Sequence, residues 1–309
     1  MKLLLDKGAN TEAALGTGET ALYASAYNGH LEVVKLLLDK GANTEAALNT
    51  RATALYISAE KGHPEITKLL LGKGAKIEAA LGAGETALHI SAQNGHPQVV
   101  KLLLDNGANT EATLNTGETA LYISAHNGHL EVVKLLLHNG ANAEATRNTG
   151  ETALYISAQN GHLEVVKLLL HNGANAEATR NTGETALYIS AQNGHPEVVK
   201  LLLDNGANPE AARYTGATAL SVSAQNGHLE VVKLLLDKGA NTEAALGTGE
   251  TALYISAYNG HIEVVKLLLE KGAVREATTN KSETAVDVAV KNGHKAIVKL
   301  LTSSLKSPK

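Results

Sequence analysis

The stretch GETALYISAQNGHLEVVKLLLHNGAN at residues 150–175 decides the fold, because the chain repeats it with few changes. Its threonine recurs every 33 residues without an insertion or a deletion, at Thr20, Thr53, Thr86, Thr119, Thr152, Thr185, Thr218, Thr251 and Thr284. Units of this size cannot each bury an apolar face alone, so they stack on their neighbours. The period therefore predicts a solenoid with a long open surface and no single central pocket, which favours binding over catalysis.

Each unit contains the signals for two short helices, as residues 50–83 illustrate. The first helix is expected over residues 54–61, with Thr53 capping its free N–H groups. The second follows a Gly-His turn, and in three units a proline stands at its first position, at Pro64, Pro97 and Pro196. It is expected to end near a glycine that takes the left-handed conformation. The remaining dozen residues, as in 41–52, predict an extended loop or hairpin.

The repeated unit resembles the ankyrin repeat, in its length of 33 residues, its threonine cap, its Gly-His turn, its leucine run and its Gly-Ala. The resemblance implies an all-α solenoid of helix-helix-hairpin units in a curved stack, whose concave side of hairpins and first helices usually grips another protein. On this basis residues 1–17 are a truncated half-repeat, residues 18–302 are nine repeats with a polar last one, and residues 303–309 are a polar tail. We expect the chain to be the C-terminal portion of a longer protein, because residues 3–5 align with the middle of a second helix, residues 36–38.

Composition narrows the choice of partner and compartment. The net charge is −4, from 27 basic and 31 acidic residues, which gives no electrostatic footprint for nucleic acid. The chain has no cysteine, and no stretch approaches the roughly 20 apolar residues of a membrane span. These features predict a monomeric, cytoplasmic protein that binds a protein partner without a cofactor, without nucleic acid and without membrane insertion.

Three columns of equivalent residues depart from the family pattern or vary within the copied unit. The tip column lies where ankyrin repeats tend to carry an aspartate and consists of Leu15, Leu48, Leu81, Leu114, Arg147, Arg180, Arg213, Leu246 and Thr279. The tyrosine column lies where the family usually has a histidine and consists of Tyr23, Tyr56, Tyr122, Tyr155, Tyr188 and Tyr254, with His89, Ser221 and Asp287 as exceptions. The helix-end column consists of Tyr27, Glu60, Gln93, His126, Gln159, Gln192, Gln225, Tyr258 and Lys291.

Each column has two interpretations. The tip leucines either form a broken apolar stripe beside three arginines, which suits a partner with one apolar and one acidic end, or fold against the neighbouring hairpins. The tyrosine rings either stack between repeats with their hydroxyls on backbone partners, or anchor a ligand. The helix-end residues either serve recognition or drift. The candidates for partner binding are Leu48, Leu81, Leu114, Arg147, Arg180, Arg213, Tyr56, Tyr122, Tyr155, Tyr188, Tyr254, Gln93, His126, Gln159 and Gln192.

No catalytic, metal or cofactor site is expected from the pattern. Nine of the 13 histidines occupy the Gly-His turn at one per repeat, and helices stacked roughly 10 Å apart hold such rings too far apart to share a zinc ion. Serines such as Ser58 and Ser157 have no base beside them within the repeat. We therefore expect a non-enzymatic scaffold for protein binding. The alternative is a passive spacer or elastic segment of a larger protein.

Overall fold

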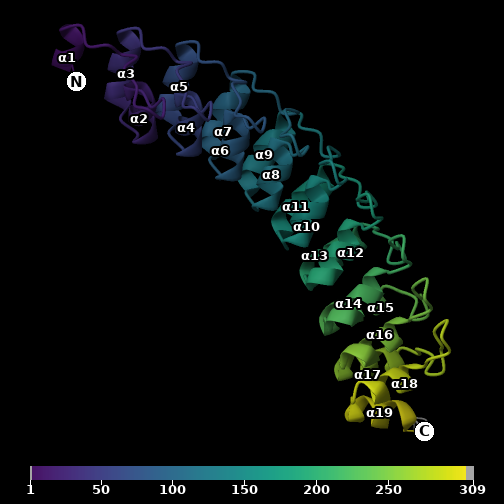
Figure 1. Ribbon diagram of the computed structural model, residues 1–309. Coiled ribbons are helices and arrows are strands. Elements are labelled where there is room, and N and C mark those ends of the chain that lie inside the picture. Colours follow the sequence, from purple (N-terminus) through teal and green to yellow (C-terminus); the bar gives the residue numbers. More distant parts are fainter. Residues whose placement is uncertain (1, 304–309) are drawn as a thin grey trace. The chain divides into compact units, whose positions relative to one another are not determined.

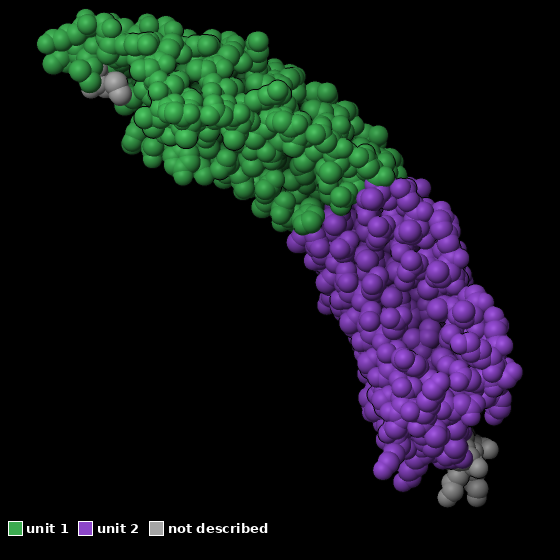
Figure 2. Space-filling view, viewed as in Figure 1, with its two compact units in different colours: residues 1–148 green, residues 149–309 purple. Residues whose placement is uncertain are grey.

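The structure is a computed structural model that describes residues 2–303, and the chain forms two compact units, residues 1–148 and 149–309 (Figure 2). All regular elements of the described residues are α-helices, joined by loops that contain isolated antiparallel bridges such as Ala47 with Thr53. Apart from the polar stretch 304–309, which lies outside the described residues, the predicted division into a half-repeat and nine repeats stays a prediction.

The helices alternate between a short one and a longer one along both units (Figure 1). The first unit contains α1 (Lys2–Asp6), α2 (Ala21–Tyr27), α3 (Leu31–Asp39), α4 (Ala54–Glu60), α5 (Pro64–Gly72), α6 (Ala87–Gln93), α7 (Pro97–Asp105), α8 (Ala120–His126) and α9 (Leu130–His138). The second contains α10 (Ala153–Gln159), α11 (Leu163–His171), α12 (Ala186–Asn193), α13 (Pro196–Asp204), α14 (Ala219–Asn226), α15 (Leu229–Asp237), α16 (Ala252–Asn259), α17 (Ile262–Glu270), α18 (Ala285–Lys291) and α19 (Lys295–Thr302).

Within each unit the helices pack in two rows. In the first unit, α2, α4, α6 and α8 each contact the next helix of that row, and α3, α5, α7 and α9 form the second row beside it (Figure 1). The second unit repeats this arrangement from α10 to α19. Each unit is therefore an all-α solenoid, as the repeat period predicts.

The predicted helix signals are confirmed with small changes of boundary. Thr53 Oγ1 accepts the backbone N–H of Tyr56 at 3.2 Å, which caps α4, and α4 ends at Glu60, one residue earlier than expected. Pro64 occupies the first turn of α5. That helix ends at Gly72, two residues before Gly74, which adopts the expected positive φ of 84°.

The first helix of a repeat is buried on almost all sides. In α4 every residue from Ala54 to Ala59 is buried, although the sequence predicted only an alternate set facing inward. The reason is that α4 lies between α2 and α6 and also packs on its own partner α5. A helix enclosed in this way needs small residues, and Ser58 and Ala59 are fully buried there. The Oγ of Ser58 donates to the carbonyl of Leu55, so this serine is a core residue.

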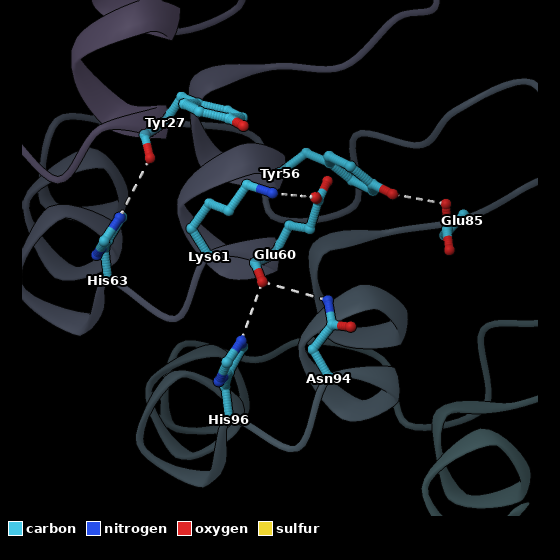
Figure 3. A network of polar contacts seen from close by, with 8 residues as sticks. All are labelled: Tyr27, Tyr56, Glu60, Lys61, His63, Glu85, Asn94 and His96. Atoms are coloured by element: carbon cyan, nitrogen blue, oxygen red, sulfur yellow. Dashed lines mark hydrogen bonds and ion pairs between the residues drawn. The ribbon is translucent and has the colours of Figure 1, made fainter. Parts of the chain in front are cut away.

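Histidine rings tie each repeat to the one before it (Figure 3). The Nε2 of His96 lies 2.9 Å from the backbone oxygen of Glu60, and that of His63 lies 3.3 Å from the oxygen of Tyr27. The ring of His96 also lies against Gly62, where an added Cβ would come within 2.7 Å of it. The Gly-His turn therefore has the structural role that the sequence predicts, with glycine required by the close approach as well as by its φ of 68°.

A second tie runs along the hairpins and was not predicted. The Oε1 of Glu45 accepts the backbone N–H of Lys76 at 2.9 Å, and that of Glu78 accepts the N–H of Asn109 at 2.8 Å. The same bond recurs 31 residues apart in both units, as between Glu210 and Asn241. Charge-assisted bonds of this kind fix the spacing of neighbouring hairpins.

One repeat carries a strained residue that offers a stability test. Arg51 has a φ of 70°, where most other repeats have a glycine, such as Gly84 with a φ of 86°. We expect R51G to raise the free energy of unfolding by about 0.5–1 kcal/mol, because glycine removes the left-handed strain and offsets part of that gain by its freedom in the unfolded chain. Urea denaturation measures the change. R51A is the control: it keeps the Cβ, and an equal gain from R51A would contradict the argument.

Candidate functional site

The tip leucines are only partly covered. Leu48, Leu81 and Leu114 are half-buried, while Leu15 is 67% exposed. The structure therefore lies between the two interpretations of this column: the side chains lean on neighbouring hairpins and still present apolar surface.

The tyrosine column belongs mainly to the core, so the prediction that these rings anchor a ligand is wrong for most of it. Tyr56 is 6%, Tyr122 4%, Tyr155 2% and Tyr188 5% exposed, because each ring lies between successive first helices. Burial raises the pKa of Tyr155 to about 12, so its hydroxyl stays protonated at neutral pH. Tyr254 is the exception: it is half-buried.

The tyrosine hydroxyls also have partners other than those expected. Backbone partners were predicted, but the Tyr56 hydroxyl donates to Oε2 of Glu85 at 2.7 Å and the Tyr254 hydroxyl donates to Oε2 of Glu283 at 3.1 Å (Figure 3). Each bond joins a tyrosine to the carboxylate that precedes the threonine cap of the next repeat. The column therefore couples neighbouring repeats through side chains.

The three tip arginines are paired inside the protein, so they do not form a free basic patch for an acidic partner. The Nε atoms of Arg147, Arg180 and Arg213 each lie 3.4 Å from a glutamate carboxylate of the preceding repeat, namely Glu118, Glu151 and Glu184. The arginine side chains are about one third exposed, whereas the side chains of Glu151 and Glu184 are 9% and 7% exposed. Half-buried arginines thus compensate nearly buried carboxylates.

Four of the predicted residues meet in one groove of the first unit. This N-terminal groove has a volume of about 280 Å³ and is lined by Gln93, Leu114, Glu118, Tyr122, Ile123, His126 and Asn127. It lies along α8, between the end of α6 and the tip residue Leu114. The tip and helix-end columns are therefore adjacent in space, and the groove presents an apolar wall beside amide and carboxylate groups.

The second unit forms the same groove four repeats further along the chain. This C-terminal groove has a volume of about 300 Å³ and is lined by Gln225, Leu246, Glu250, Tyr254, Ile255, Tyr258 and Asn259. Each lining residue is the repeat equivalent of one in the N-terminal groove, and the only change of residue type is from His126 to Tyr258. The carboxylates Glu118 and Glu250 were missed among the sequence candidates. The signal for them was the glutamate column before the threonine caps.

The other predicted residues lie on the same columns without meeting in these grooves. Gln192 is exposed and Gln159 is half-buried, at the ends of α12 and α10 respectively. Over residues 2–303 no group of three or more His, Asp or Glu side chains is placed to hold a metal ion. None of the helices described there is long and apolar enough to cross a membrane.

One repeat keeps the histidine arrangement that the others lack. His89 is fully buried, and its Nδ1 accepts the backbone N–H of Thr86 at 3.3 Å while its Nε2 lies 2.9 Å from the backbone oxygen of Ala112. The Nε2 therefore carries the proton, and a second proton on Nδ1 would break the bond from Thr86. Burial lowers the pKa of His89, and the bond to Ala112 opposes this only in part.

This lowered pKa gives a pH dependence of stability. Below an ordinary histidine pKa of about 6.5 the unfolded chain binds a proton that the folded chain does not, so His89 lowers the free energy of unfolding as pH falls from 7 toward its folded-state pKa. We expect the wild type to lose about 1 kcal/mol more than H89Y between pH 7.5 and 5.5, measured by urea denaturation. H89Y is the matched variant, since tyrosine stands at this position in six repeats. Equal losses would contradict the assignment.

Comparison with known proteins agrees with the geometry. The family model described as ankyrin repeats (3 copies) matches residues 1–80, 79–147, 139–213, 174–245 and 220–308. A comparison with curated protein sequences returned no match. The matched segments cover almost the whole chain, and they coincide with stacked helix pairs and intervening hairpins. The chain therefore belongs to the ankyrin repeat family.

Proposed function

We propose that this protein is a non-enzymatic scaffold that binds a partner protein on its tip–helix face, the surface formed by the tip column and the helix-end column. Ankyrin repeats are generally protein–protein interaction modules. The observation that carries the proposal is the recurrence of one groove, built from both columns, at the same register in each unit.

The variability of the helix-end column supports this face. The core residues of the repeat are nearly constant, as in the fully buried Leu103, Leu136 and Leu169. The helix-end position, in contrast, holds Tyr, Glu, Gln, His or Lys in different repeats, and Gln93, Gln192 and Gln225 are exposed. Positions that the fold does not constrain, placed beside an apolar groove, suit recognition of another protein.

The structure changes the best experiment for this face. Reversing the charge of the three tip arginines would set new carboxylates beside buried glutamates, so loss of binding could not be separated from loss of folding. The helix-end column is a cleaner target, because Lys291 occupies it naturally. We expect the triple variant Q159K/Q192K/Q225K to capture the partner from the native cell lysate at least about tenfold less well than the wild type.

A control matched in charge separates this face from the opposite one. The triple variant E164Q/E197Q/E230Q also adds three positive charges, but on exposed residues of α11, α13 and α15 in the other row of helices. We expect it to capture the partner as the wild type does. Equal loss of capture in both triple variants would show a charge effect without a specific face, and unchanged capture in the first would contradict the proposed face.

The spacer alternative has one observation in its favour. Residues 127–162 and 160–195 are identical, so neighbouring repeats carry the same surface as well as the same core. A spacer depends on repeat number, whereas a binding face depends on surface residues. Deletion of residues 160–192 leaves a native junction, and a change in end-to-end distance without any change in partner capture would favour the spacer.

A further inference from the structure

Two aromatic rings of the first unit are covered by cations of the protein itself. The Nζ of Lys61 lies 4.8 Å from the ring centroid of Tyr27, and the guanidinium carbon of Arg147 lies 5.9 Å from the ring centroid of Tyr122. In each case the cation comes from the next repeat. Such cation–π contacts are worth about 0.5–1 kcal/mol at exposed sites and more where water is excluded.

The equivalent rings of the second unit are Tyr258 and Tyr254, and both line the C-terminal groove. Tyr258 is 52% exposed. Tyr254 is half-buried, whereas its equivalent Tyr122 is only 4% exposed. The C-terminal groove therefore presents more aromatic surface than the corresponding rings of the first unit.

Two substitutions account for this exposure. The residue equivalent to Arg147 is Thr279, and the residue equivalent to Lys61 is Asn292. Thr279 is buried and its Oγ1 accepts N–H groups of its own hairpin, so it neither covers a ring nor carries a charge. Both places that hold a cation in the first unit are thus held by short neutral residues in the second.

The carboxylate in this groove also lacks the partner that its equivalent has. In the N-terminal groove Glu118 pairs with Arg147 at 3.4 Å. In the C-terminal groove Glu250 accepts a hydrogen bond from the Thr248 hydroxyl, and within the described part of the chain it takes part in no ion pair. Lys291, the nearest helix-end lysine in sequence, is 74% exposed and pairs with Glu283 at 3.7 Å. A negative charge beside two open rings is the environment that favours a cation.

We propose that the C-terminal groove binds an arginine or lysine side chain of the partner protein. The head group would stack on Tyr258 and Tyr254 and pair with Glu250, and the aliphatic stem would lie against Leu246 and Ile255. Arginine binds more tightly than lysine, because its planar guanidinium stacks on aromatic faces and pairs with a carboxylate through two bonds. This inference rests on the proposed protein-binding function and names the partner chemistry at one of its grooves.

A titration of the full chain with defined peptides tests the inference. The probe is the peptide acetyl-Gly-Gly-Arg-Gly-Gly-amide, and the signals are the methyl resonances of Leu246 and Ile255. We expect the arginine peptide to shift these resonances, the lysine peptide to shift them at higher concentration, and the same peptide with glutamine to leave them unchanged. The N-terminal groove, whose carboxylate is already paired with Arg147, is the internal control and should bind at least about fivefold more weakly.

Variants that copy the first unit sharpen the test. T279R and N292K introduce the cations that Arg147 and Lys61 supply at equivalent positions, so the fold accommodates them, and each should abolish binding of the arginine peptide. E250Q should weaken binding by about tenfold. Arginine and glutamine peptides that bind alike, or binding that survives both E250Q and T279R, would overturn the proposal.

Selection from a random library of 12-residue peptides separates this proposal from the broader function. We expect peptides selected by the wild type to be enriched in arginine and lysine, and the enrichment to disappear with E250Q and with Y258Q, which places the glutamine of Gln192 at this position. Selected peptides without that enrichment would overturn the basic-residue proposal and leave the binding function standing. Failure to select any peptide, together with failure to capture a partner, would overturn both.

Discussion

Replacing Leu103 by alanine is expected to lower the free energy of opening of α7 by about 3 kcal/mol. Leu103 is fully buried, and α7 packs on α5, α6 and α9, so the cavity would lie where neighbouring repeats meet. In a stack of repeats the interface with the neighbours supplies much of the stability of each unit. The loss should therefore also reach α5 and α9.

Native-state hydrogen exchange of the full chain measures this effect residue by residue. The control is L102A on the same helix, where the leucine is half-buried and the loss should stay below about 1 kcal/mol. An L103A effect confined to α7, with no faster exchange in α5 or α9, would contradict the view that the repeats are stabilised through one another.

The second large effect is expected at the ion pair between Arg213 and Glu184. R213L should lower the free energy of unfolding by about 2 kcal/mol, because the carboxylate of Glu184 is nearly buried and would lose its closest cation. The more distant Arg180, at 3.9 Å, would compensate only in part. Urea denaturation of the full chain measures the loss.

The chain itself supplies the compensating variant. Where the glutamate is replaced by alanine, at Ala52 and Ala217, the tip residue 29 positions later is a leucine, at Leu81 and Leu246. The double variant E184A/R213L copies that apolar pair, and we expect it to recover at least half of the stability that R213L loses. If the losses from E184A and R213L simply add, the two side chains do not interact and the assignment is wrong.

The repeat period was enough to predict the helices, because each boundary depends on local residues such as the Thr53 cap and the proline at Pro64. The histidine turn could also be placed, since its role is set within the repeat and its neighbour. The hairpin glutamates could not, because the bond from Glu45 to the N–H of Lys76 joins residues 31 positions apart. That partner is visible only when the register between repeats is known.

The candidate site was predicted in part for the same reason. Gln93 and His126 were recognised as unconstrained positions, and the structure places both in one groove. The tyrosine column was misjudged as a possible exposed face, because burial of a ring depends on the first helices on either side of it. The difference between the two grooves depends on Thr279, which lies in the repeat after the ring that it leaves open.

Photo-crosslinking tests the central claim most directly. A benzophenone amino acid placed at position 192, in the helix-end column, is compared with the same amino acid at position 200, on an exposed site of α13. The account predicts that irradiation in the native lysate joins a discrete partner protein to position 192 and none to position 200. Crosslinks from position 200 alone, or the same products from both positions, would contradict binding on the tip–helix face.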